Sequence, residues 1–114
     1  MNLDFESQFN CAIKQVKEKG KVYAQKKSDS WLRQGLTSSV LASVIKSLPE
    51  KLTDKKSEYS AKDSNVYRNH VAVTAEAIRE EIESKVEYEA ANFEFEKLRS
   101  LCSLEKKILK EIEG

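Results

Sequence analysis

The chain has 114 residues, of which 34% are charged and 39% are hydrophobic, and its formal net charge is +1. A chain this short and polar can bury one narrow hydrophobic core but not a thick one. Its three Gly and one Pro leave little material for turns, which disfavours sheets and favours long helices. A net charge near zero gives no overall electrostatic argument for nucleic-acid binding.

Residues 3–48 are expected to be helical, with Asn2 or Asp4 near the cap. Gly20 could mark a kink, a break or a close helix crossing, and Ser28-Asp29-Ser30 could cap a second helix or lie within a continuous one. Apolar residues recur at helical spacing through this segment: Phe5, Phe9, Ile13, Val16, Tyr23, Leu32, Leu36, Val40, Leu41, Val44, Ile45 and Leu48.

A polar connector is predicted over residues 49–64, and part of it could be helical. Pro49 disfavours helical backbone at Leu48, so the first helical segment is predicted to end there. At the other end of the connector, Asp63 or Ser64 is suited to cap the helix that follows.

A long helix is predicted over residues 65–113, which contain no Pro and no Gly. At about 1.5 Å per residue it would span roughly 70 Å. Tyr88 and Phe93 fall outside the main apolar stripe and indicate a second buried face, which a helix needs when it packs both within its chain and against another copy. The stripe comprises Tyr67, Val71, Thr74, Ala77, Ile78, Ile82, Val86, Ala91, Phe95, Leu98, Leu101, Leu104, Ile108 and Ile112.

These elements predict an all-α fold in one domain, residues 1–114. The expected architecture is an elongated helical hairpin or a three-helix arrangement with a long C-terminal helix and coiled-coil-like packing. Residues 1–56 carry 11 Lys/Arg and 6 Asp/Glu, whereas residues 57–114 carry 9 and 13. Opposite charges of the two halves favour antiparallel packing or self-association.

A lysine cluster from Lys14 to Lys27 holds six lysines and one acid, Glu18. Basic residues near the aromatic side chains of Tyr23 and Trp31 can contact a nucleic-acid backbone and stack bases. Lysines on a helix also often serve only to solvate it, and that alternative stays open. Because lysine dominates over arginine, any contact would be with phosphates without base readout. The candidate nucleic-acid-binding residues are Lys14, Lys17, Lys21, Lys26, Lys27 and Arg33.

A protein interface is the second candidate site. The single tryptophan, Trp31, is either a core aromatic at a helix junction or an exposed anchor of the kind enriched in binding hot spots. Part of the apolar surface of so thin a chain is expected to stay uncovered, which favours a homo-oligomer. The candidate interface residues are Trp31, Tyr88, Phe93, Leu98, Leu101 and Ile108.

No catalytic signature is apparent, so we expect no enzyme, no cofactor and no metal. The only histidine, His70, is not in a Glu-x-x-His motif, and no glycine-rich phosphate loop is present. Cys11 and Cys102 lack metal-ligand spacing and are expected to be two buried thiols in a reducing cytosol. The first residues have no basic region followed by an apolar run, so we expect no signal peptide, no membrane contact and a cytoplasmic location.

Several segments of the chain resemble small helical proteins that tailed bacteriophages encode near recombination genes. The segments include Tyr23-Ala24-Gln25-Lys26-Lys27-Ser28, Ala75-Glu76-Ala77-Ile78-Arg79 and Phe95-Glu96-Lys97-Leu98-Arg99-Ser100. Tyr88-Glu89-Ala90-Ala91-Asn92 is similar to a segment of the UvsY recombination mediators of T-even phages. Members of that family are helical, oligomerise, bind single-stranded DNA and help to load a recombinase.

The resemblance implies a phage-type accessory protein in DNA recombination or replication, located in the host cytoplasm. It would act as an oligomeric helical scaffold that contacts single-stranded DNA, a DNA-processing protein, or both. Implied protein partners are a recombinase, a single-strand-binding protein or a host nuclease. Two alternatives stay open: a protein-binding module without DNA contact, such as a phage inhibitor of a host enzyme, and a structural coiled-coil protein.

Overall fold

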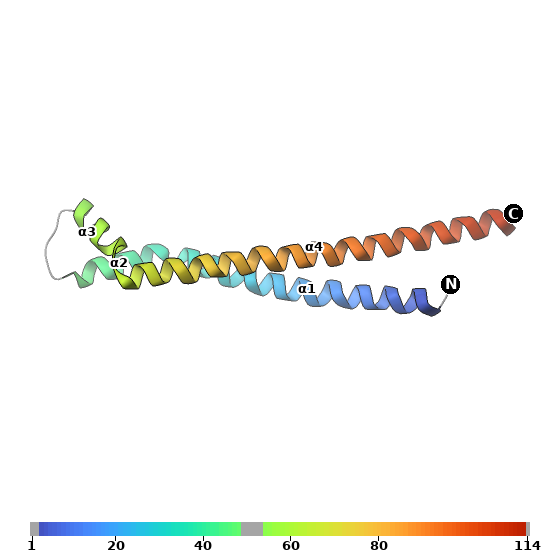
Figure 1. The fold of residues 1–114 in the computed structure, drawn as a ribbon, viewed down its shortest axis with the longest axis horizontal. Coiled ribbons are helices and arrows are strands. Elements are labelled where there is room, and N and C mark those ends of the chain that lie inside the picture. Colours follow the sequence, from blue (N-terminus) through green and yellow to red (C-terminus); the bar gives the residue numbers. More distant parts are fainter. Residues whose placement is uncertain (1–2, 49–53, 114) are drawn as a thin grey trace. The chain divides into compact units, whose positions relative to one another are not determined.

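The computed structural model describes residues 3–48 and 54–113, and these form four helices (Figure 1). They are α1 (Leu3–Gly35), α2 (Thr37–Ser47), α3 (Asp54–Lys62) and α4 (Asn65–Glu113). The described part of the chain contains no strand. The predicted all-α fold and its long C-terminal helix are therefore confirmed. The suggested cap at Asn2 and the residue Pro49 lie outside the described residues.

The first helical segment is interrupted at Gly35 and Leu36, and not at either of the two positions singled out from the sequence. Helix α1 runs through Gly20 and through Ser28-Asp29-Ser30 without a break. The Leu36 N–H donates to the carbonyls of both Leu32 and Arg33, at 3.1 and 3.2 Å, which is the shared bond of a helix terminus.

Helix α2 ends where the proline rule placed the boundary. Leu48 adopts an extended conformation, with φ −65° and ψ 132°. The predicted connector is partly helical, because α3 occupies residues 54–62. Ser64 caps α4, since its Oγ accepts a hydrogen bond from the Tyr67 N–H at 3.2 Å, the contact expected between an N-cap and the third helical residue.

The contacts of the chain group into two units. Unit 1 comprises the residues up to 24 together with those from 83 onward, and unit 2 comprises residues 25–82.

In unit 1, α1 and α4 pack antiparallel. The rings of Phe9 and Phe95 lie 5.2 Å apart and those of Tyr23 and Tyr88 lie 5.9 Å apart, so residue numbers rise along α1 as they fall along α4. We call the packed residues the unit 1 seam; they recur at intervals of three and four, the spacing of a coiled coil. They are Phe5, Phe9, Ala12, Val16, Lys19 and Tyr23 on α1, and Ser84, Tyr88, Ala91, Phe95, Leu98 and Cys102 on α4.

Gly20 accommodates a close helix crossing in unit 1. A Cβ atom at this position would stand 3.2 Å from Cε1 of Tyr88, closer than ordinary van der Waals contact. Of the three roles considered for Gly20, the structure therefore supports the close crossing. The continuous helix at this point tolerates the poor helix propensity of glycine because the Tyr88 ring packs over it.

Unit 2 buries polar as well as apolar side chains. Ser30 and Thr74 are buried, as are Val44, Ala61 and Ala77, and α2 contacts α3. The Ser30 hydroxyl accepts a hydrogen bond from the Gln34 side-chain amide at 2.9 Å, which satisfies the buried oxygen.

His70 is also bonded in the interior of unit 2. Its Nε2 lies 3.0 Å from Oγ1 of Thr37, so this half-buried ring joins α2 to α4.

Two burial predictions are wrong. The apolar stripe predicted for α4 is only partly buried, because a seam between two helices covers only a narrow arc of each helix. Within one chain Phe93 is 72% exposed, whereas Tyr88, the other residue assigned to a second face, packs in the unit 1 seam. Cys11 is exposed and Cys102 is half-buried, whereas both thiols were expected to be buried.

Candidate nucleic-acid and interaction surfaces

Three lysines form an exposed row on α1 in unit 1. Lys14, Lys17 and Lys21 are all exposed and are spaced by three and four residues, so they share one side of the helix. Lys14 lies about 160–200° around the helix axis from the seam residues Ala12 and Val16. The row therefore faces away from α4 and is accessible to a ligand as large as a nucleic-acid strand. We call these three residues the lysine row.

The other predicted nucleic-acid contacts already have partners. In unit 2, Nζ of Lys26 lies 3.2 Å from a carboxylate oxygen of Glu80, and Nε of Arg33 lies 3.3 Å from Asp29. Lys27 places its Nζ 5.7 Å from the ring centroid of Trp31, within the range of a cation–π contact. The two ion pairs reduce the positive charge that Lys26 and Arg33 offer to an outside ligand, and the Trp31 ring occupies the Lys27 ammonium group without neutralising it. These contacts distinguish the three residues from the lysine row.

The ion pairs between α1 and α4 follow the predicted attraction between the two halves of the chain. In unit 1, Lys19 contacts Glu87 at 3.3 Å, and Lys26 with Glu80 is the equivalent pair in unit 2. The Lys19 and Glu87 side chains are partly exposed, so their attraction is screened by water and contributes at most about 1 kcal/mol. These pairs favour the antiparallel register over other alignments of the two helices, but they add little to the stability of the fold.

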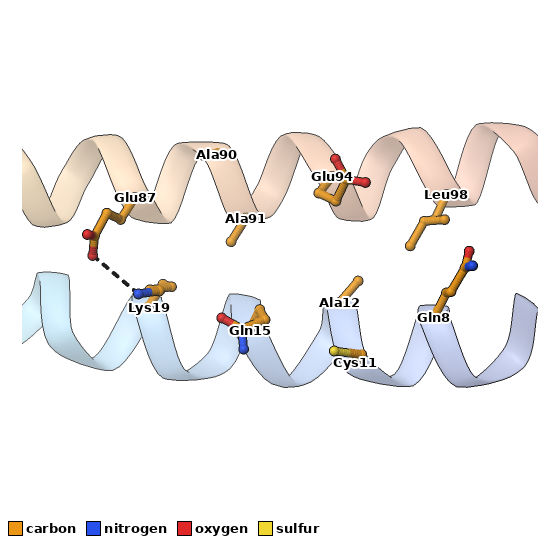
Figure 2. Close-up of a pocket in the computed structure, with 10 residues that line it drawn as sticks. All are labelled: Gln8, Cys11, Ala12, Gln15, Lys19, Glu87, Ala90, Ala91, Glu94 and Leu98. Atoms are coloured by element: carbon orange, nitrogen blue, oxygen red, sulfur yellow. Dashed lines mark hydrogen bonds and ion pairs between the residues drawn. The ribbon is translucent and has the colours of Figure 1, made fainter. Parts of the chain in front are cut away.

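A shallow groove of about 560 Å³ lies between α1 and α4 in unit 1 (Figure 2). Ala12, Ala91 and Leu98 give it an apolar floor, and the Lys19–Glu87 ion pair lies at one end. Small side chains at the floor leave the space, because Ala12 and Ala91 line it where larger residues would fill it. The remaining lining residues are Gln8, Cys11, Gln15, Ala90 and Glu94.

The chemistry of this groove is that of a contact surface. Its single lysine is paired with Glu87 at one end, and Ala12, Ala91 and Leu98 offer only apolar groups to a ligand. Within residues 3–48 and 54–113, no three His, Cys, Asp or Glu side chains gather in a way that could hold a metal ion. Over the same residues, no helix is both long enough and apolar enough to cross a membrane.

The shifted pKa values belong to ordinary surface pairs. The Arg79 guanidinium donates hydrogen bonds to the Glu76 carboxylate and holds the pKa of that carboxyl below its usual value. A hydrogen bond from Lys62 lowers the pKa of Glu58 in the same way and raises that of the lysine. Both pairs are three or four residues apart on one helix, so they stabilise helix surfaces and indicate no reactive group.

The six predicted interface residues divide between the seam and the surface. Tyr88 and Leu98 belong to the unit 1 seam, where Leu98 is only 8% exposed. The other four are exposed: Trp31 (68%), Phe93 (72%), Leu101 (44%) and Ile108 (48%).

Five further residues that were assigned to the core stripe from the sequence are also exposed: Val71, Ile82, Val86, Leu104 and Ile112. For Val86 and Leu104, which lie on the unit 1 part of α4, the signal that separates them from the seam was present in the sequence. A strict alternation of three and four residues runs from Ser84 to Cys102 through the seam and leaves Val86 and Leu104 outside it.

Comparison with known proteins found no family model, no curated protein and no solved structure that matches this chain. The resemblance to phage recombination mediators stays a prediction. The surfaces of the molecule are therefore the main basis for assigning a function.

Proposed function

We propose that the protein is a helical scaffold that contacts single-stranded DNA through the phosphate backbone and acts by positioning, without bond chemistry. The lysine row carries this proposal: Lys14, Lys17 and Lys21 are exposed together and face away from the packed side of α1. Clustered lysine ammonium groups attract phosphates and release condensed counterions, which favours binding without sequence preference. The resemblance to phage recombination accessory proteins points in the same direction.

The lysine row is better suited to contact the phosphates of an extended strand than to read the edges of bases. Lysine presents a compact point charge, whereas the bidentate reading of base edges typically uses arginine, asparagine or glutamine. The row extends along α1 for about 10 Å, at about 1.5 Å per residue from Lys14 to Lys21. That length matches only a few nucleotides, so useful affinity would need several copies of the row on one strand.

Fluorescence anisotropy with a labelled oligothymidine in low salt tests this function. The triple variant Lys14→Gln, Lys17→Gln, Lys21→Gln should bind at least about tenfold more weakly than the wild type. Lys46, Lys55 and Lys56 are exposed lysines of unit 2, and their triple replacement by Gln removes the same charge elsewhere. Equal loss in both variants, or no binding by the wild type, would refute a phosphate contact at the lysine row.

A protein-binding module without DNA contact is the second candidate. It is favoured by exposed apolar residues at the C-terminal end of α1 in unit 2, namely Trp31 and Leu32 on the helix and Leu36 directly after it. Tryptophan is enriched at the centres of protein interfaces, and contiguous exposed apolar side chains often mark such sites. Under this alternative, Trp31→Ala would abolish capture of the protein partner while the lysine-row variant retained full activity.

A further inference from the structure

In unit 1, α4 carries a row of exposed side chains on the side that faces away from α1. We define the outer stripe as seven residues: Val86, Ala90, Phe93, Lys97, Leu101, Leu104 and Ile108. At about 100° per residue, they fall within a sector of about 80° around the helix axis. The unit 1 seam is centred about 140° away from that sector. Packing of α4 on α1 therefore leaves the outer stripe in water, where large apolar side chains are unfavourable.

The spacing of the outer stripe is the same when read from either end. Successive members are separated by four, three, four, four, three and four residues, with Lys97 at the centre. If a second α4 lies antiparallel with the two Lys97 positions adjacent, each member meets a member of the other stripe. Phe93 then faces Leu101 of the second copy, Ala90 faces Leu104, and Val86 faces Ile108. This self-complementarity is what a two-fold symmetric interface requires.

The charges of α4 obey the same symmetry. Residues 83–96 contain five acids and one base, a net charge of −4, whereas residues 97–110 contain five bases and one acid, a net charge of +4. An antiparallel pair centred on Lys97 places the acidic segment of each copy beside the basic segment of the other. A parallel pair would place like charges together, which is unfavourable.

Individual pairs on one flank of the stripe agree with this arrangement. Glu89 is positioned opposite Lys107 of the second copy, and Lys85 opposite Glu111. On the other flank Glu87 is positioned opposite Glu105, but Lys19 of the same chain already contacts Glu87 at 3.3 Å and offsets its charge.

The two Lys97 side chains at the centre can lie close together without strong repulsion. Lys97 has its own carboxylate neighbour, Glu94, at 3.8 Å. Its long side chain can direct the ammonium group to the edge of the contact while its methylene groups remain within it. Lysine at the centre therefore permits the symmetric pairing.

The end of α4 supplies a separate observation. Every residue from Lys106 to Glu113 is exposed, although Ile108, Leu109 and Ile112 are large and apolar. A helical segment as short as residues 106–113 has little stability of its own in water. A neighbouring helix that covered Ile108 would therefore stabilise this end of α4.

We propose that two copies of this chain pair through their outer stripes, with α4 antiparallel to α4 and Lys97 at the two-fold axis. The paired region, residues 86–108, is about 34 Å long at 1.5 Å per residue. This inference deepens the scaffold part of the proposed function and does not depend on DNA contact. A dimer would present two lysine rows, which supplies the multiple contacts that one short row lacks.

Two adjacent residues give a matched test of the stripe. Ile108 and Leu109 are each 48% exposed, but Ile108 lies on the outer stripe and Leu109 lies about 100° around the helix from it. Light scattering without DNA should give wild type and Leu109→Glu twice the 13.0 kDa mass of one chain. Ile108→Glu should raise the dimer dissociation constant at least about tenfold, because a carboxylate would be buried against Val86 of the partner. A wild type that stays monomeric up to about 100 μM, or equal behaviour of the two variants, would overturn the proposal.

Two measurements test the orientation. With Cys11 and Cys102 replaced by Ser, Lys97→Cys should form a disulfide-linked dimer under mild oxidation, whereas Ala90→Cys should not. Efficient linking through Ala90→Cys would indicate parallel helices and refute the arrangement.

Glu89→Lys and Lys107→Glu should each weaken the dimer, and the combined variant should recover most of the wild-type affinity. Failure of the combined variant to recover would exclude this register.

These experiments separate the inference from the DNA hypothesis, since each reads mass or cross-linking in the absence of nucleic acid. A dimer that binds no DNA would refute the proposed function and leave the interface intact. A monomer that binds DNA through the lysine row would do the reverse.

Discussion

Replacing Leu98 by alanine should destabilise unit 1 more than the same change at Leu109 on the same helix. Leu→Ala removes three carbon atoms, each worth about 0.8 kcal/mol when buried. Leu98 is 8% exposed and Leu109 is 48% exposed. The expected losses are therefore about 2 kcal/mol for Leu98→Ala and about 1 kcal/mol for Leu109→Ala.

Other contributions to this comparison cancel or are small. Both positions are helical, and Leu and Ala have similar helix propensities, so backbone preference changes equally in the two variants. Leu98 also lines the open groove of unit 1, so its removal widens a solvated surface and leaves no sealed cavity. For this reason the cost should fall near the lower end of the range seen for buried leucines, which is about 2–5 kcal/mol.

Urea denaturation followed by circular dichroism at 222 nm measures the difference. With a slope of about 2 kcal/mol per molar urea, Leu98→Ala should lower the midpoint by about 1 M and Leu109→Ala by about half as much. Comparison at two protein concentrations separates unfolding from dissociation. Equal midpoints for the two variants would show that Leu98 is not packed against α1 and would refute the unit 1 seam.

Three further predictions concern helix contacts and caps. Gly20→Leu should destabilise by about 1–3 kcal/mol in the same assay, because the new side chain collides with the Tyr88 ring; an unchanged midpoint would refute the close crossing. Ser64→Ala should cost about 1 kcal/mol by removing the cap of α4, and Ser64→Asp should restore it. Because Arg79 lowers the pKa of Glu76, wild type should exceed Glu76→Gln in stability at neutral pH, and this advantage should be lost as the pH falls through the lowered pKa of Glu76; a pH-independent difference would contradict the pairing.

The helices were predictable because their signals are local. A segment without Pro or internal Gly, preceded by Ser64, was expected to be one long helix, and α4 spans Asn65–Glu113. The interruption at Gly35 was not predicted, since Gly20 is an equally good local signal. What distinguishes them is a tertiary contact: Tyr88 packs over Gly20, whereas nothing lies within 4 Å of a Cβ placed at Gly35.

The candidate surfaces were predictable only in part. The lysine cluster is visible in the sequence, but which lysines meet acids depends on the register between α1 and α4. That register brings Glu87 to Lys19 and Glu80 to Lys26, residues more than 50 positions apart in each case. The division of α4 into a seam and an outer stripe was readable in principle, because the intervals from Ser84 to Cys102 are strictly three and four.

The most direct test of the central claim is the salt dependence of single-stranded DNA binding. For a single strand, removing one lysine–phosphate pair makes the slope of log K against log salt shallower by about 0.7. We predict that replacing Lys14, Lys17 and Lys21 by Gln makes the slope shallower by about 2 for each chain bound to DNA, while the triple Gln variant of Lys46, Lys55 and Lys56 keeps the wild-type slope. Identical slopes for all three proteins, or no binding of wild type near 50 mM salt, would contradict this prediction.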